Sequence, residues 1–206
     1  MKFAIIDCET TGFPIRPKKF NTWFSPKTIS KYNSSRTVSI SFKICNLDNN
    51  VITFNETEDY IIKPDGFIIS NDNFHGITTD HALEHGITMA DFSAIFNEKF
   101  SEVDNIIAHN VLFDVNVIQS EFYRGNFTRS IDIMNGINKI CSGDKTIAIV
   151  GLINKGGYPK MPRLEELYEY VFNSNLLNAH QSRFDVENLF KCIYELHNNN
   201  TVSFFT

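Results

Sequence analysis

Residues 2–12 read KFAIIDCETTG, an apolar run that ends in two acids and a turn. The run predicts a buried strand, and the Thr-Thr-Gly sequence after it predicts a turn. Because side chains two apart on a strand face the same side, Asp7 and Glu9 should present their carboxylates together while Cys8 points away. Two close carboxylates repel unless a proton or cation neutralises them, and oxygen-only ligands favour Mg²⁺ or Mn²⁺. The stretch therefore predicts a metal site at a strand end, with an incidental acidic strand end as the alternative.

The pattern beyond this strand predicts one mixed α/β domain over residues 1–206, with a short C-terminal tail at about 198–206. Two further strands are expected, antiparallel to the first, at 37–45 and 51–63. Periodicity then predicts helical structure at about 78–103, 111–124, 145–153, 163–172 and 182–197, with strands at 104–108 and about 129–133.

Composition places the chain among ordinary globular proteins, with 42% hydrophobic and 21% charged residues. Its apolar runs are shorter than a transmembrane helix needs, and Asp7 comes too early for a signal peptide. The four cysteines are widely scattered and read as reduced thiols rather than as a disulfide framework or zinc site. These features predict an intracellular protein, cytoplasmic or nuclear and not secreted, with no membrane partner.

The charge is unevenly distributed along the chain. The net charge is −5, yet the segment between Thr10 and Leu47 contains no acid. Its seven bases are Arg16, Lys18, Lys19, Lys27, Lys31, Arg36 and Lys43. Much of this segment, residues 14–36, is expected to be a long loop, which in a compact domain is usually functional or mobile. A basic segment on an acidic body suits local contact with phosphate, and an accidental bias in a solvated loop is the alternative.

A second acidic motif, His109-Asn110-Val111-Leu112-Phe113-Asp114, lies at a predicted strand-to-helix junction. Asn110 is expected to cap the helix and Asp114 to lie in its first turns. Complementing the helix dipole is the alternative role for Asp114. His109 ends a buried strand and is expected to be a structural histidine.

A third motif, His180-Gln181-Ser182-Arg183-Phe184-Asp185, opens the last predicted helix. Positions five apart lie about 140° apart around a helix, so His180 and Asp185 cannot share one face. His180 is therefore expected in the preceding loop and Asp185 in the first turn. An acid in a first turn is also a common stabilising device.

Together, these three motifs resemble those of the DEDDh family of 3′–5′ exonucleases, which includes polymerase proofreading subunits and RNA-trimming enzymes. Supporting matches are FHGIT at 74–78, KMPRLEEL at 160–167 and NAH at 178–180. The resemblance spans about residues 7–190. It departs from the family at Ser182, where the family usually has alanine, and in loop 14–36, which is longer than the usual hairpin connection.

The resemblance implies a ribonuclease H-like fold, a mixed five-stranded sheet flanked by helices. It implies that two divalent cations, Mg²⁺ or Mn²⁺, are held by four carboxylates, those of Asp7, Glu9, Asp114 and Asp185. It implies that His180 takes a proton from the attacking water, so that 5′-mononucleotides leave a 3′ end.

Several further residues are candidates for binding the terminal nucleotide. Thr10, Thr11 and Phe13 are the first candidates, with Phe13 either stacking on a base or forming part of the core. His75 and Ile77 are weaker candidates for the same pocket.

The implied substrate is single-stranded or 3′-ended DNA or RNA, with DNA slightly favoured. A polymerase or replication partner and the oligomeric state are left open by the sequence. Two alternatives remain, a catalytically inactive nucleic-acid-binding module and a metal-dependent phosphoesterase acting on small nucleotides. Retention of all five family residues disfavours the first, and the basic segment disfavours the second.

Overall fold

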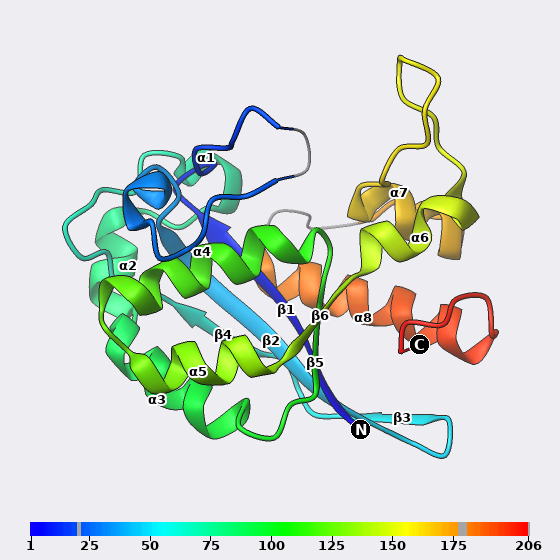
Figure 1. The fold of residues 1–206 in the computed structure, drawn as a ribbon, viewed down its shortest axis with the longest axis horizontal. Coiled ribbons are helices and arrows are strands. Elements are labelled where there is room, and N and C mark those ends of the chain that lie inside the picture. Colours follow the sequence, from blue (N-terminus) through cyan, green and yellow to red (C-terminus); the bar gives the residue numbers. More distant parts are fainter. Residues whose placement is uncertain (20–21, 177–180, 206) are drawn as a thin grey trace.

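A mixed β-sheet forms the centre of the molecule, with helices on both faces (Figure 1). The computed structural model describes residues 1–19, 22–176 and 181–205. The strands are β1 (Lys2–Thr10), β2 (Thr37–Asp48), β3 (Val51–Phe54), β4 (Glu58–Ile61), β5 (Asn105–Ala108) and β6 (Asn138–Cys141). Both β3 and β4 pair with β2, so six strands fill five positions, in the order β3 or β4, β2, β1, β5, β6. β1 is antiparallel to β2 and parallel to β5, which confirms the expected mixed sheet.

Two layers of helices cover this sheet. The helices are η1 (Ile29–Tyr32, 3₁₀), α1 (Asp72–His75), α2 (Thr79–His85), α3 (Met89–Lys99), α4 (Val111–Arg124), α5 (Thr128–Gly136), α6 (Ser142–Val150), α7 (Leu164–Phe172) and α8 (Ser182–Asn198). Helices α3, α4 and α5 pack on the face that carries Ala4, Ile6 and Cys8, while α7 and α8 pack on the face of Phe3 and Ile5. Within the described ranges, no helix combines the length and apolar character needed to cross a membrane.

Two expected elements differ from the structure. The strand expected at 51–63 is divided into β3 and β4, which pair with different parts of β2. The strand expected near 129–133 is wrong, because these residues lie in helix α5 and the strand follows at β6. Ile131 and Ile133 alternate as in a strand, but the buried pair is Ile131 and Met134, whose spacing of three is helical.

The strand alternation of β1 is as expected. Cys8 is buried against α4, whereas Asp7 and Glu9 continue the opposite face and are only partly buried. Ser41 lies directly across from Asp7 on β2, and Ser39 directly across from Glu9. The end of β1 therefore presents acids, with small polar neighbours, on the face that α8 covers.

Candidate active site

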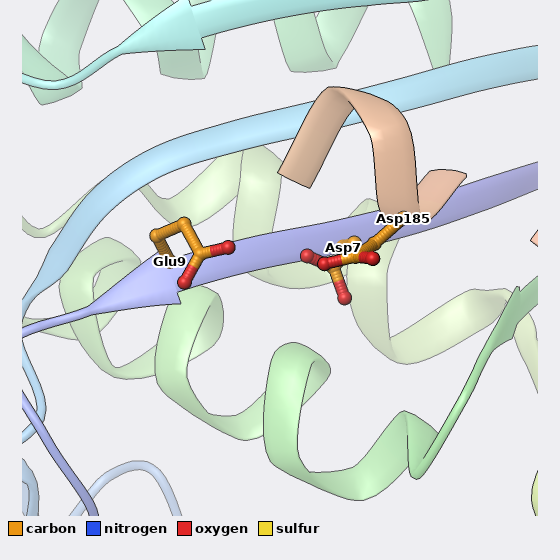
Figure 2. A group of neighbouring side chains, drawn as sticks. All are labelled: Asp7, Glu9 and Asp185. Atoms are coloured by element: carbon orange, nitrogen blue, oxygen red, sulfur yellow. The ribbon is translucent and has the colours of Figure 1, made fainter. Parts of the chain in front are cut away.

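Three carboxylates meet where the end of β1 faces the first turn of α8. Asp7 and Glu9 come from the strand and Asp185 from the helix (Figure 2). Each offers an oxygen, and these oxygens all lie within 4.8 Å of one another. Oxygens bound to opposite sides of a Mg²⁺ ion are separated by about 4 Å, so the spacing fits a divalent cation. The structure thus brings together residues that are 178 positions apart (7 to 185) in the sequence.

The electrostatics of the cluster favour a cation. Burial, followed by the charges of Asp114, Asp185 and Glu9, raises the pKa of Asp7 well above its ordinary value. Burial and the charge of Asp185 raise the pKa of Glu9 to about 7. Within the described part of the chain, no lysine or arginine forms an ion pair with Asp7 or Glu9. These carboxylates offer only oxygen ligands, are shielded from water and repel one another. They therefore fit the expected Mg²⁺ or Mn²⁺.

Asp114 reaches the same strand from the other layer. β5 pairs with β1 only as far as Ile5, so the edge of β1 beyond that point is free of strand pairing on this side. There the Cys8 N–H donates to Asp114 Oδ1 at 3.0 Å. Burial raises the pKa of Asp114 to about 7, and the hydrogen bonds from Cys8 act in the opposite direction. Its oxygens lie outside the 4.8 Å group, so its role as a metal ligand stays a prediction.

The two residues that precede α4 differ in outcome. Asn110 stands at the N-cap position, as expected, with a left-handed backbone, but its side chain makes no capping hydrogen bond. His109 is structural, as expected: its Nδ1 lies 3.0 Å from Ser142 Oγ, and its Nε2 lies 2.7 Å from Pro162 O. Burial lowers the pKa of His109.

Serine hydroxyls hold the start of α8 against the sheet. Ser182 Oγ lies 3.0 Å from Ser39 Oγ and 2.7 Å from Ser41 Oγ, and Ser41 in turn donates to Asp59 Oδ1 at 2.6 Å. Ser182 is three residues before Asp185, so these hydrogen bonds fix the turn that supplies a carboxylate. In the sequence, Ser182 stands out only as a departure from the alanine that is usual in the family. The missed signal was the pair of serines that alternate with apolar residues in a buried strand.

His180, the expected general base, lies outside the described residues, as does the rest of the Asn178–His180 motif.

All five candidates for nucleotide binding line cavities that reach Glu9. A cavity of about 500 Å³ is lined by Glu9, Thr10, Thr11, Phe13, Phe74, His75 and Phe113, among others. A smaller cavity of about 200 Å³ is lined by Glu9, His75 and Ile77. Phe13 is 82% exposed, so the alternative that it forms part of the core is wrong. The threonine hydroxyls already form hydrogen bonds: that of Thr10 donates to Gly12 O in the turn, and that of Thr11 accepts from the Arg36 N–H.

The bases of the acid-free segment have different environments. Arg36 is buried and its guanidinium forms two hydrogen bonds with Glu121, at 2.6 and 3.1 Å. Lys43 is also buried, 3.2 Å from a Glu187 oxygen. Lys18 and Lys19 are exposed. The charge that the segment offers to a phosphate is therefore smaller than its composition suggested.

Comparison with known proteins identifies the fold. The sequence matches no protein-family model and no curated protein. Escherichia coli exonuclease I bound to a dA16 oligonucleotide superposes with a TM-score of 0.67 and 22% identity, over 96% of this chain and 41% of that one. The zinc-bound form of the E. coli exonuclease I complex with single-stranded DNA gives 0.67 and 21%, over 97% and 41%.

An exonuclease I complex with SSB-Ct gives a TM-score of 0.68 and 22% identity, over 97% of this chain and 42% of that one. The chain thus spans about two fifths of the length of these proteins. At this level of identity the likeness establishes the fold, and the ribonuclease H-like architecture that the motifs implied is confirmed.

Proposed function

We propose that this chain is a metal-dependent 3′–5′ exonuclease that hydrolyses phosphodiester bonds at nucleic-acid 3′ ends and releases 5′-mononucleotides. The observation that carries the proposal is the cluster of Asp7, Glu9 and Asp185 oxygens within 4.8 Å, in the fold of exonuclease I. That protein has been solved with oligonucleotides and with single-stranded DNA. DNA is the slightly favoured substrate. A replication partner and an intracellular location stay predictions.

Four carboxylates would hold the cations, those of Asp7, Glu9, Asp114 and Asp185. When bound, a pair of Mg²⁺ or Mn²⁺ ions supplies positive charge that stabilises the attacking and leaving oxygens of the phosphodiester. Burial, together with the charges of Asp114, Asp185 and Glu9, raises the pKa of Asp7, so a cation beside it would stabilise the charged form of its carboxyl group. Asp114 positions the strand as well, because it accepts the Cys8 N–H next to Asp7.

The terminal nucleotide is assigned to the cavity of about 500 Å³ that begins at Glu9. Phe13 offers an exposed ring on which a base can stack. His75 Nδ1 accepts a hydrogen bond from the Ile77 N–H at 3.2 Å, which holds the two weaker candidates together at the border of the smaller cavity. Glu9 lines both cavities, so a nucleotide seated there has its phosphate close to the carboxylates.

His180 is proposed as the general base on the strength of its motif. A base acts by removing a proton in the transition state, so His180→Ala should lower the single-turnover rate by about 10²–10⁴-fold. Metal and substrate affinity should change little, in contrast with Asp185→Asn, which should also weaken metal binding. A mutant that cleaves at the wild-type rate across pH would make His180 structural.

Digestion of end-labelled oligonucleotides tests the function directly. With Mg²⁺ or Mn²⁺, a 5′-labelled strand should shorten stepwise, while a 3′-labelled strand should release labelled mononucleotide at once. DNA and RNA strands of one sequence should be compared. Shortening from the 5′ end, internal cuts, or undiminished activity in excess EDTA would each overturn the proposal. Hydrolysis of small phosphodiesters alone would favour the phosphoesterase alternative, and binding without hydrolysis the inactive module.

A further inference from the structure

Three aromatic rings form a row that leads away from the terminal-nucleotide cavity. The ring centroids of Phe13 and Phe113 are 5.9 Å apart, and those of Phe113 and Trp23 are 6.2 Å apart. Phe13 and Phe113 line the cavity of about 500 Å³ next to Glu9. Trp23 lines a different cavity, of about 570 Å³. This row, which we call the aromatic track, therefore connects two cavities.

Positive charge accompanies the track. The Arg16 guanidinium carbon lies 3.6 Å from the Trp23 ring centroid, and Arg16 Nε donates to Thr22 O at 3.1 Å. Arg16 thus covers one face of the ring and holds it in place while adding a cation beside it. Lys18 and Lys19 are exposed on the same loop.

The cavity at the far end of the track is polar as well as apolar. It extends from the start of α4, where Asn110 and Leu112 line it, to the edge strand β6, where Asn138 and Cys141 line it. Lys139, Asp144 and Lys145 also line it. Amide side chains of the Asn type hydrogen-bond to base edges, and the lysines exceed the acids by one (two lysines, one aspartate). Such a surface is more complementary to a nucleic-acid strand than to an apolar peptide.

We propose that the aromatic track carries a single-stranded substrate from the terminal-nucleotide cavity to the cavity beside β6, an inference that rests on the proposed function. Unpaired bases stack on the rings, and the phosphates lie near the basic loop. The bases of a duplex are already stacked and paired, so they do not engage the rings. The track therefore selects single strands and extends the binding site beyond the terminal nucleotide.

Trp23 is the only tryptophan in the chain, so its fluorescence reports on the track alone. The probes are oligodeoxythymidines of increasing length and a blunt-ended DNA hairpin, added to Asp7→Ala protein in EDTA so that no strand is digested. The dinucleotide should leave the emission unchanged, because it ends before Trp23. Longer single strands should quench the emission, and the hairpin should not.

Three variants in the wild-type background complete the test, with binding measured in EDTA and cleavage measured with Mg²⁺. Trp23→Ala should bind a long oligodeoxythymidine at least about fivefold more weakly, whereas Trp23→Phe should retain most of the affinity. Tyr194→Ala is the matched control, since it removes an exposed aromatic side chain from α8, on the opposite face of the sheet. Cleavage of the dinucleotide by Trp23→Ala should fall by a smaller factor than the affinity for the long strand, because the dinucleotide ends before Trp23.

The outcomes separate this inference from the proposed function. Unchanged Trp23 emission at every length, or equal quenching by the hairpin, overturns the track even if dinucleotides are cleaved. If Trp23→Ala loses activity or affinity equally for long strands and dinucleotides, the track is also overturned. The ring would then support the fold rather than contact the strand. Failure of the wild type to cleave any strand refutes the exonuclease instead.

Discussion

The acids of the carboxylate cluster and the bases of loop 14–36, the basic loop, both stand out in the sequence. In the structure, only the acids lie together at one site. Asp7 and Glu9 lie on one face of a regular strand, and a helix turn brings Asp185 to them. Two bases of the loop have unrelated environments: Arg36 is buried in an ion pair, while Lys18 is exposed. Strand geometry fixes where a side chain points, whereas the position of a loop charge depends on distant partners. A functional hypothesis from residue spacing is therefore stronger on a strand than on a loop.

The largest effect should come from the cluster. Asp7→Ala should abolish metal-dependent cleavage while leaving the fold intact, because it removes a carboxylate from the group within 4.8 Å and relieves repulsion in the metal-free protein. Cleavage assays, circular dichroism and a Mn²⁺ titration by calorimetry check this. Cleavage at the wild-type rate would show that these acids are incidental.

Arg36→Met should instead lower the stability of the fold. This effect would distinguish the buried base of the loop from an exposed one. The substitution leaves Glu121 buried without its main partner, at a cost of about 3 kcal/mol in the free energy of unfolding. Arg124 Nε, 3.3 Å from Glu121, limits the loss. Lys18→Met is the matched control and should unfold at the wild-type denaturant concentration. If both variants unfold alike, the difference drawn within the loop does not hold.

Ser182→Ala tests whether the helix side of the cluster depends on its anchoring to the sheet. Loss of the hydrogen bonds to Ser39 and Ser41 should loosen the first turn of α8 and weaken Mn²⁺ binding by about tenfold. Ser130→Ala, which removes a comparable buried hydrogen bond to Ser93, is the control. It should lower stability without changing metal affinity. Equal metal affinity in wild type and Ser182→Ala would show that the hydroxyl of Ser182 does not contribute to the metal site.

The dependence of stability on pH should reveal the repulsion among the carboxylates of the cluster. The pKa values of Glu9 and Asp114 are raised to about 7 in the folded protein, so the folded state holds more protons than the unfolded state. Its stability in EDTA should therefore fall as the pH rises from about 4 to about 7, and added Mg²⁺ should reverse the fall. Thermal unfolding across this range checks the sign. Asp7→Asn should show a shallower decline, and an equally steep one would place the cause outside the cluster.

The smallest effect is expected from the exposed loop bases. Reversing both Lys18 and Lys19 to Glu should weaken binding of long strands a few-fold and flatten its dependence on salt. Dinucleotide cleavage should be unaffected. If long and short substrates lose affinity equally, the loop does not contact the strand.

Local periodicity predicted the parts of the molecule that depend on local geometry. The helix expected at 111–124 is α4, and the one at about 182–197 is α8 within one residue. It failed at α5, where two isoleucines alternate as they would in a strand. Local periodicity also could not predict which residue pairs with Arg36, because Glu121 lies 85 positions away. The sequence also does not predict the contacts of Ser182 on α8, because Ser39 and Ser41 lie 143 and 141 positions away.

The placement of the four cysteines makes the protein suitable for site-selective labelling. Burial raises the pKa of the Cys8 thiol well above its ordinary value, and those of Cys45 and Cys192 to about 12. Cys141 is only half-buried and lines the cavity that Trp23 also lines. Because the thiolate is the reactive form, a maleimide dye should attach at Cys141 alone. Tryptophan and dye would then form a donor and acceptor pair across one cavity without any engineered cysteine.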